Sequence, residues 1–212
     1  MGGLADSVRG VLRELGEDAR TAAQHVALVS VGGSVLVPRS VRKRLYRALG
    51  ADLASPPGGA FMFSGDPANL VVGRDVYFNQ RVFVEAKGRV SIGEGSAIGM
   101  DVLVLTSHHE VAPDGAWSTT AVGRPVEIGR GVWIGARAVV LPGAVVEDGV
   151  VVAGGAVVAG RLLTGGLYAG VPARLVRTFD RPDGDRRDGL AAPLDPSPTE
   201  DPPRAASTPP PR

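Results

Sequence analysis

The hydrophobic pattern of this chain repeats every six residues over much of its length. A helix would repeat near 3.6 residues and a flat strand at two, so a sustained period of six fits neither. It predicts a chain that turns a corner every six residues and points one aliphatic side chain inward from each flat side. Stacked coils of this kind form a parallel β-helix. The clearest aliphatic set is Ile128, Ile134, Val140, Val146, Val152 and Val158.

A second set of small or apolar residues stands four positions after the first, where the corners are expected. Glycines precede several of these corner residues, as a tight turn would require. The corner set is Val132, Ala138, Ala144, Val150, Ala156 and Leu162, and the glycines are Gly131, Gly143, Gly149 and Gly155.

The same register continues upstream with two interruptions. Two extra residues enter between Val84 and Ile92, and a longer break runs from about His108 to Pro125. A loop that leaves a rigid scaffold is a common place for catalytic groups. The upstream positions in this register are Val72, Phe78, Val84, Ile92, Ile98 and Val104.

The segment before the repeat has helical spacing. Residues 4–23 carry apolar side chains three and four apart, which predicts a helix. His25 lies in this helical region, and we interpret it as a surface or packing residue. After Pro38, we expect a second helix that Ser40 caps and that runs to about Leu49.

The apolar stretch Val26–Val37 is too short to span a bilayer. Basic residues follow it, so peripheral contact with an anionic membrane is one interpretation. Packing of the helix's apolar side on the end of the β-helix is the other, and the one we favour. These basic residues are Arg39, Arg42, Lys43, Arg44 and Arg47.

The last 33 residues have almost no large apolar side chains and are rich in Pro, Asp, Arg and Ala. Such a segment cannot bury enough surface to offset its ordering entropy, so a disordered tail is expected. The predicted fold is mainly β, with an N-terminal helical segment at 1–60, a β-helix domain at 61–178 and a disordered tail at 179–212.

Composition narrows the function classes. The net charge of +1 does not suggest a nucleic-acid partner, which would favour a strongly basic face. The chain has no cysteine, so it has no thiol nucleophile, thiolate zinc site or disulfide. This composition is compatible with a reducing cytoplasm, where we expect the protein to be.

The strongest candidates for chemistry lie at the longer break, where His108 and His109 are adjacent. Histidine suits proton transfer near neutral pH. Two surface imidazoles in a loop would be the alternative. Glu110 follows directly and could orient His109, although an exposed loop carboxylate is the simpler interpretation.

Here the chain resembles the hexapeptide-repeat acyltransferases, in the maltose and galactoside O-acetyltransferase group. Thr106-Ser107-His108-His109 matches their Thr-x-x-His segment, which implies that His109 is the general base. Asn79 stands six residues after Gly73, as their asparagine does. The stretch 169–177 is similar to their C-terminal signature. The resemblance covers about residues 61–178 and implies a left-handed β-helix.

The resemblance also implies the cosubstrate and assembly. It indicates acetyl-CoA as donor, no metal, a hydroxyl-bearing carbohydrate or small-molecule acceptor, and a homotrimer with sites between chains. Trp133 would lie near the coenzyme groove or simply cover the face of the β-helix. The segment Gly135–Ala136 would offer a backbone N–H to the oxyanion, Gly154 would contact the coenzyme through its backbone, and Arg174 and Arg177 would approach its phosphates.

The chain departs from the family in two places. The family's Thr and Lys near the coenzyme are Ala159 and Gly160 here, which leaves only backbone contacts to the coenzyme at these positions. The N-terminal segment does not resemble the lid of maltose acetyltransferases and is more similar to that of a related group that modifies surface polysaccharides. The acceptor is therefore a sugar or a related polysaccharide of unspecified identity. A non-catalytic β-helix scaffold and a zinc carbonic-anhydrase-like β-helix are the remaining alternatives.

Overall fold

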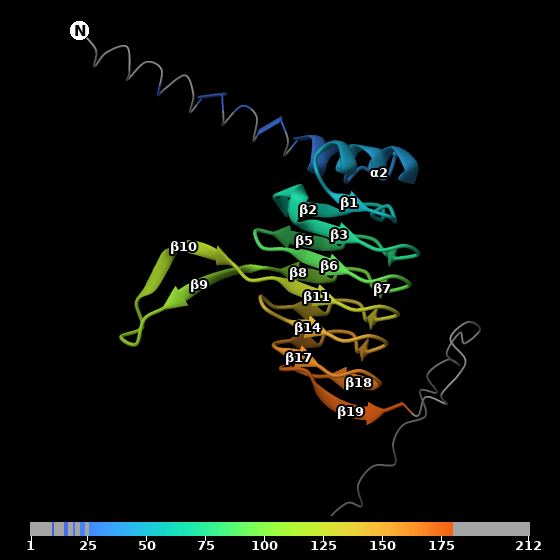
Figure 1. The fold of residues 1–212 in the computed structure, drawn as a ribbon, viewed down its shortest axis with the longest axis vertical. Coiled ribbons are helices and arrows are strands. Elements are labelled where there is room, and N and C mark those ends of the chain that lie inside the picture. The colour runs from blue at the N-terminus through green and yellow to red at the C-terminus, as the bar shows by residue number, and fades with distance from the viewer. Residues whose placement is uncertain (1–9, 11–14, 17–18, 20–21, 24–25, 180–212) are drawn as a thin grey trace, which may run out of the picture. The chain divides into compact units, whose positions relative to one another are not determined.

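A computed structural model describes residues 10, 15–16, 19, 22–23 and 26–179 (Figure 1). Most of the helix predicted at 4–23, His25, and the tail after Phe179 lie outside these residues. Phe179 itself donates its N–H to the Gly165 carbonyl at 2.7 Å. It therefore belongs to the last coil and not to the predicted tail.

The described residues form a parallel β-helix whose chain passes through three sheets in turn (Figure 1). Sheet 1 contains β1 (Asp52–Leu53), β3 (Leu70–Val72), β6 (Val90–Ile92), β11 (Val126–Ile128), β14 (Val145–Val146) and β17 (Arg161–Leu162). Sheet 2 contains β4 (Tyr77–Phe78), β7 (Ala97–Ile98), β12 (Trp133–Ile134), β15 (Val151–Val152) and β18 (Gly166–Ala169), with β19 (Arg174–Thr178) antiparallel at its end. Sheet 3 contains β2 (Met62–Gly65), β5 (Phe83–Ala86), β8 (Leu103–Leu105), β13 (Val139–Val140) and β16 (Val157–Val158).

The six-residue periodicity is confirmed by burial. Ile134, Val140, Val152 and Val158 are each 0% exposed, and they stack on the equivalent residues of neighbouring coils. Each corner is preceded by a residue with positive φ. Gly131 and Gly155 adopt φ of 59° and 71°, where a Cβ would be strained. Asp75, Arg81, Asp101 and Arg137 accept the same conformation without being glycine.

The repeat ends earlier than the sequence suggested. Leu162 was expected at a corner, but it lies on β17 opposite Val146 and points into the core at 4% exposure. The step from Val158 to Leu162 is four residues instead of six, so the last coil is smaller. The β-helix also starts earlier than residue 61, because β1 already pairs with β3 through Asp52 and Leu53.

Both predicted interruptions are present. The first is accommodated where β5 runs on to Ala86 before the chain reaches β6. The second is an antiparallel hairpin of β9 (Ser107–Val111) and β10 (Trp117–Gly123), which projects from the side of the stack (Figure 1).

The N-terminal end of the stack is covered by η1 (Val26–Val31) and α2 (Arg39–Ala48) (Figure 1). Tyr46 of α2 is fully buried, with its ring 5.8 Å from those of Phe61 and Phe63. The predicted packing of this helix on the β-helix is therefore confirmed. Arg42 is buried too, and it donates to four backbone carbonyls.

The predicted cap of α2 is wrong. The N-cap is Pro38, no side chain caps the helix, and Ser40 lies inside its first turn. The side-chain cap is found instead on the short helix η2 (Pro67–Asn69), where Asp66 accepts from the N–H of Ala68 at 2.9 Å. Within the described part of the chain, no helix has the length and apolar character needed to cross a membrane.

Candidate active site

Four of the predicted site residues lie on one edge of the β-helix, where the chain passes from sheet 2 to sheet 3. They are Asn79, Gly135, Ala136 and Gly154. The coils stack directly along this edge: Asn79 donates its N–H to the Ile98 carbonyl at 2.9 Å, and Gly135 donates to Val152 at 2.7 Å. We call this line the 2–3 edge.

Close stacking explains the glycine at position 135. A Cβ there would lie 2.5 Å from the backbone nitrogen of Gly154, which is too close for any side chain. The glycine is thus required by the fold itself. Its N–H is already used in the bond to Val152, so it cannot serve an oxyanion. The N–H of the next residue, Ala136, has no acceptor among the described residues, which makes it the available donor of this segment.

The side chain of Asn79 is oriented by its own backbone. Its Oδ1 accepts from the N–H of Gln80 at 2.8 Å. Because that N–H can only donate, the amide oxygen must face it and the NH₂ group points elsewhere. Asn79 can therefore offer two N–H donors to a ligand at the 2–3 edge.

His109 lies on β9, in the exposed hairpin. Its Nδ1 is 2.7 Å from the carbonyl oxygen of Ser118, and its ring meets Trp117 edge-on at 5.4 Å between centroids. A carbonyl can only accept, so Nδ1 carries the proton and Nε2 keeps its lone pair. A histidine in this tautomer is set up to remove a proton through Nε2.

The neighbours of His109 have different environments. His108 is half-buried and pairs with Val122 across the hairpin, and adjacent strand residues point to opposite faces. Glu110 is exposed. The contact that orients His109 is made by the Ser118 carbonyl and not by Glu110. The sequence pattern offered no signal for Ser118, because it acts through its backbone carbonyl.

The remaining predicted residues share sheet 2. Trp133 is 46% exposed. It pairs with Val151 on the neighbouring strand, Val151 pairs with Leu167 on the next, and Leu167 pairs with Arg177 on the last strand of the sheet. Three ladder steps correspond to roughly 14 Å. The guanidinium of Arg177 lies 5.2 Å from the ring centre of Phe179, and Arg174 donates to the Ala173 carbonyl at 3.1 Å.

One chain does not bring all these residues together. The hairpin that carries His109 leaves after β8 of sheet 3 and returns to β11 of sheet 1. His109 therefore starts from the edge where the chain passes from sheet 3 to sheet 1. The face of sheet 3 separates this edge from Asn79 and Ala136 on the 2–3 edge.

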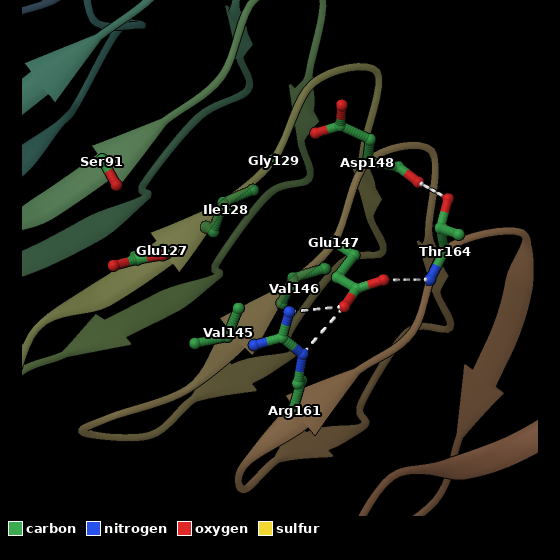
Figure 2. A pocket seen from close by; sticks show the side chains of 10 residues that line it. All are labelled: Ser91, Glu127, Ile128, Gly129, Val145, Val146, Glu147, Asp148, Arg161 and Thr164. Carbon is green, nitrogen blue, oxygen red and sulfur yellow. Dashed lines mark hydrogen bonds and ion pairs between the residues drawn. The ribbon is translucent and has the colours of Figure 1, made fainter.

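A recess of about 540 Å³ lies elsewhere, on sheet 1 (Figure 2). At its centre Glu147 accepts from the N–H of Thr164 at 2.9 Å and from Arg161 at 2.7 Å. These bonds, the one from Thr164 first, hold the pKa of Glu147 below its ordinary value. None of the predicted site residues lines this recess, and Glu147, Arg161 and Thr164 bind one another across two coils. We interpret it as a structural feature of the smaller last coil.

No group of three or more His, Asp or Glu side chains is arranged as a metal site within the part of the chain that the structure describes. The carbonic-anhydrase-like alternative requires three converging histidines, and only His108 and His109 lie in this part. Nothing in the geometry supports that alternative.

Comparisons with known proteins agree with this architecture. Residues 125–160 match the family model described as Bacterial transferase hexapeptide (six repeats). A comparison with curated protein sequences finds no match.

Several solved structures are similar over most of their length. A maltose O-acetyltransferase from Clostridium difficile 630 is 21% identical, with a TM-score of 0.67, covering 77% of this chain and 88% of its own. A hexapeptide-repeat acetyltransferase from Vibrio cholerae O1 biovar eltor, in complex with acetyl coenzyme A, is 23% identical, with a TM-score of 0.69 and coverage of 78% and 90%. A galactoside acetyltransferase in complex with coenzyme A is 22% identical, with a TM-score of 0.64 and coverage of 77% and 82%.

These likenesses establish the fold and the repeat. The matched segment coincides with the most regular coils, from just before β11 to just after β16. The resemblance to hexapeptide-repeat acyltransferases that the sequence indicated is therefore confirmed for the repeat and for the fold.

Proposed function

We propose that this protein is an acetyl-CoA-dependent O-acyltransferase. It would move an acetyl group from acetyl-CoA to a hydroxyl of a sugar or of a related small-molecule or polysaccharide acceptor. The observation that carries the proposal is the Nδ1 contact of His109 with the Ser118 carbonyl at 2.7 Å. It leaves Nε2 as a base on a projecting hairpin, where an acceptor hydroxyl can reach it.

The reaction needs few groups because a thioester is already activated. Nε2 of His109 removes the proton of the acceptor hydroxyl while its oxygen attacks the thioester carbonyl. The N–H of Ala136 donates to the oxyanion that forms, and the NH₂ of Asn79 holds the acceptor or the intermediate. The C–S bond then breaks, and the proton on His109 passes to the departing coenzyme A sulfur.

The coenzyme would lie along sheet 2 and the 2–3 edge. Trp133 offers an exposed aromatic surface, and Gly154 an exposed stretch of backbone without a side chain. Arg174 and Arg177 lie about 14 Å further along the stack, where their guanidinium groups can pair with phosphates. Two of the similar structures are complexes with acetyl coenzyme A or coenzyme A, which supports this cosubstrate.

A homotrimer would bring the two edges together. The outward side chains of sheets 2 and 3 are mostly apolar, with Ser64 and Glu85 among the exceptions on sheet 3. Those of sheet 1 include Ser91, Glu127 and Arg161. Continuous apolar faces on a single chain favour burial against another copy. The hairpin of one copy would then carry His109 to the 2–3 edge of the next. The outward sets are Tyr77, Ala97, Trp133, Val151 and Leu167 on sheet 2, and Met62, Phe83, Leu103, Val139 and Val157 on sheet 3.

A panel of acyl-CoA donors against sugars, polysaccharides and simple alcohols tests the proposal. Release of the free coenzyme A thiol measures turnover, and mass spectrometry of the acceptor separates transfer from hydrolysis. We expect acceptor-dependent release with acetyl-CoA, and release at least about a hundred-fold slower with a His109→Ala variant. If neither acetyl-CoA binding nor acetyl transfer is found with any acceptor, the non-catalytic scaffold becomes the better interpretation.

A further inference from the structure

A single carboxylate holds the base of the hairpin. Glu85 is the third residue of β5 and lies beside Leu105, the last residue of β8. One of its oxygens, Oε2, accepts from the N–H groups of Thr106 at 2.9 Å and Ser107 at 2.7 Å. The other, Oε1, accepts from the Ser107 hydroxyl at 2.5 Å.

Thr106 completes this network. It is fully buried, and its hydroxyl group donates to the backbone carbonyl of Glu85 at 2.8 Å. The oxygen of this hydroxyl group also accepts from the N–H of Gly88 at 2.9 Å. Its own carbonyl accepts from the N–H of Arg124 at 2.8 Å, where the chain returns from the hairpin. Both ends of the hairpin are thus tied at one point.

The reason for a carboxylate here is the broken repeat. In regular coils, backbone N–H groups bond to carbonyls of the adjacent coil, as Val139 does to Ala156 at 2.9 Å. At Thr106 and Ser107 the chain leaves the stack, so these N–H groups lose that kind of acceptor and need another. Glu85 supplies it. Burial alone would raise the pKa of Glu85, but the hydrogen bonds from Ser107 and Thr106 outweigh burial and lower it.

We propose that Glu85 is a positioning residue for His109, setting the direction in which the hairpin leaves the β-helix. The inference rests on the proposed role of His109 as the base. From Ser107 to His109 the strand advances roughly 7 Å, so a tilt of about 10° at the base would move the imidazole by ~1 Å. A misplacement of that size can cost up to about a hundred-fold in rate.

Two substitutions at position 85 separate hydrogen-bond geometry from simple loss of the side chain. Glu85→Gln keeps an oxygen for the two N–H donors, and its NH₂ can donate to the Ser107 hydroxyl, which rotates to accept. Glu85→Ala removes every side-chain acceptor. We expect kcat to fall about ten- to a hundred-fold in the alanine variant and to stay within about three-fold of wild type in the glutamine variant.

The Michaelis constant for acetyl-CoA distinguishes positioning from general damage. It should stay within about two-fold of wild type in both variants, because the proposed coenzyme residues lie on sheet 2 and the 2–3 edge, whereas Glu85 bonds to the base of the hairpin. Glu94→Ala is the matched control: this glutamate is also on the surface of a coil, paired with Arg74 at 3.3 Å, and its removal should change neither constant.

Hydrogen exchange gives a readout that does not depend on activity. Peptides that contain Thr106 and Ser107 should exchange faster in Glu85→Ala, while peptides from residues 126–158 keep the wild-type rate. If the alanine variant fails to fold, Ser107→Ala provides the milder test, since it removes only the bond to Oε1. It should lower kcat by a few-fold and leave the unfolding temperature nearly unchanged.

Three results would overturn the inference. The first is a Glu85→Ala enzyme that keeps the wild-type kcat while His109→Ala is inactive. The second is a Glu85→Gln enzyme whose kcat falls as far as that of Glu85→Ala. The third is an unchanged rate of hydrogen exchange at Thr106 and Ser107 in Glu85→Ala. If wild type itself transfers no acetyl group, the proposed function fails instead. The exchange experiment then still decides whether Glu85 orders the hairpin.

Discussion

The regular coils and the hairpin differ in how far their residues are buried and in how their strands are paired. Between β11 and β16, every inward and corner residue is buried. Every strand except β16, which ends its sheet, pairs with a strand on both sides. In the hairpin, all residues from 111 to 120 are exposed, and each strand has only the other as a partner. The coils provide a rigid frame, and the proposed base sits where that frame is interrupted.

This difference has an energetic consequence. An isolated two-stranded hairpin is marginally stable in water, so its orientation depends on how it is attached. The attachment here is the bonding of Glu85, Thr106 and Arg124 at one point. We therefore expect substitutions in the coils to affect stability and substitutions in the hairpin or at its base to affect catalysis.

The largest effect is expected in the hairpin. His109→Ala should lower kcat/KM by roughly a hundred- to ten-thousand-fold, because a general base is lost, with little change in the unfolding temperature. His108→Ala is the matched control, since the adjacent side chain points to the other face of β9. Steady-state kinetics of both variants decide the matter. An inactive His108→Ala beside an active His109→Ala would mean that the assignment is off by one residue.

A coil substitution should show the opposite behaviour. Ile134 is fully buried, so Ile134→Ala should lower the free energy of unfolding by about 2–5 kcal/mol through lost burial and the cavity left behind. Val122→Ala, at a 38% exposed site in the hairpin, should cost about 0.5 kcal/mol or less. Urea unfolding of both variants gives the comparison. Equal losses would contradict the division between frame and hairpin.

Assemblies that mix two variants test whether His109 of one chain and Asn79 of a neighbouring chain form one active site. His109→Ala and Asn79→Ala should each be nearly inactive alone. When equal amounts are unfolded and reassembled together, a site between neighbours combines the two intact residues in about one case in four, so about a quarter of wild-type activity should return. Co-assembly of each variant with itself is the control. No recovery from a verified mixed trimer would place both residues in sites within one chain.

A smaller effect is expected for the coenzyme face. Arg177→Ala should raise the Michaelis constant for acetyl-CoA about ten-fold with kcat nearly unchanged, because it removes a charged hydrogen-bond donor to phosphate. Arg161→Ala, on sheet 1, removes an arginine that bonds to Glu147 and should leave that constant unaffected. A donor without phosphates, such as acetyl-pantetheine, should show no difference between wild type and Arg177→Ala. A difference with this donor would indicate another role.

The smallest effect concerns pH. The pKa of Glu85 is lowered in the folded protein from an ordinary value of 4.5. Its contribution to stability is therefore fully present above pH 4.5 and is lost as the pH falls through the lower, folded pKa. Glu85→Gln cannot take up a proton in this range, because its amide stays neutral. The wild-type unfolding temperature should thus fall more steeply than that of the glutamine variant below pH 4.5, and parallel curves would show that Glu85 does not contribute.

The sequence alone determined the frame. A six-residue step is a local property, because each corner and each inward side chain is set by a few consecutive residues. That is why Ile134, Val140 and Val152 were predicted as core and were found fully buried. The same locality located the hairpin, since a break in a regular pattern is visible without knowing where the broken segment goes.

Only the tertiary structure decided what stands next to what. Leu162 occupies a strand and not a corner, because its pairing with Val146 of the previous coil outweighs the local period. The contact of His109 with Ser118 involves a backbone carbonyl, which every residue possesses and which leaves no mark in a sequence. The bonds from Thr106 and Ser107 to Glu85 join residues about twenty positions apart, and that separation is set by how the coils stack.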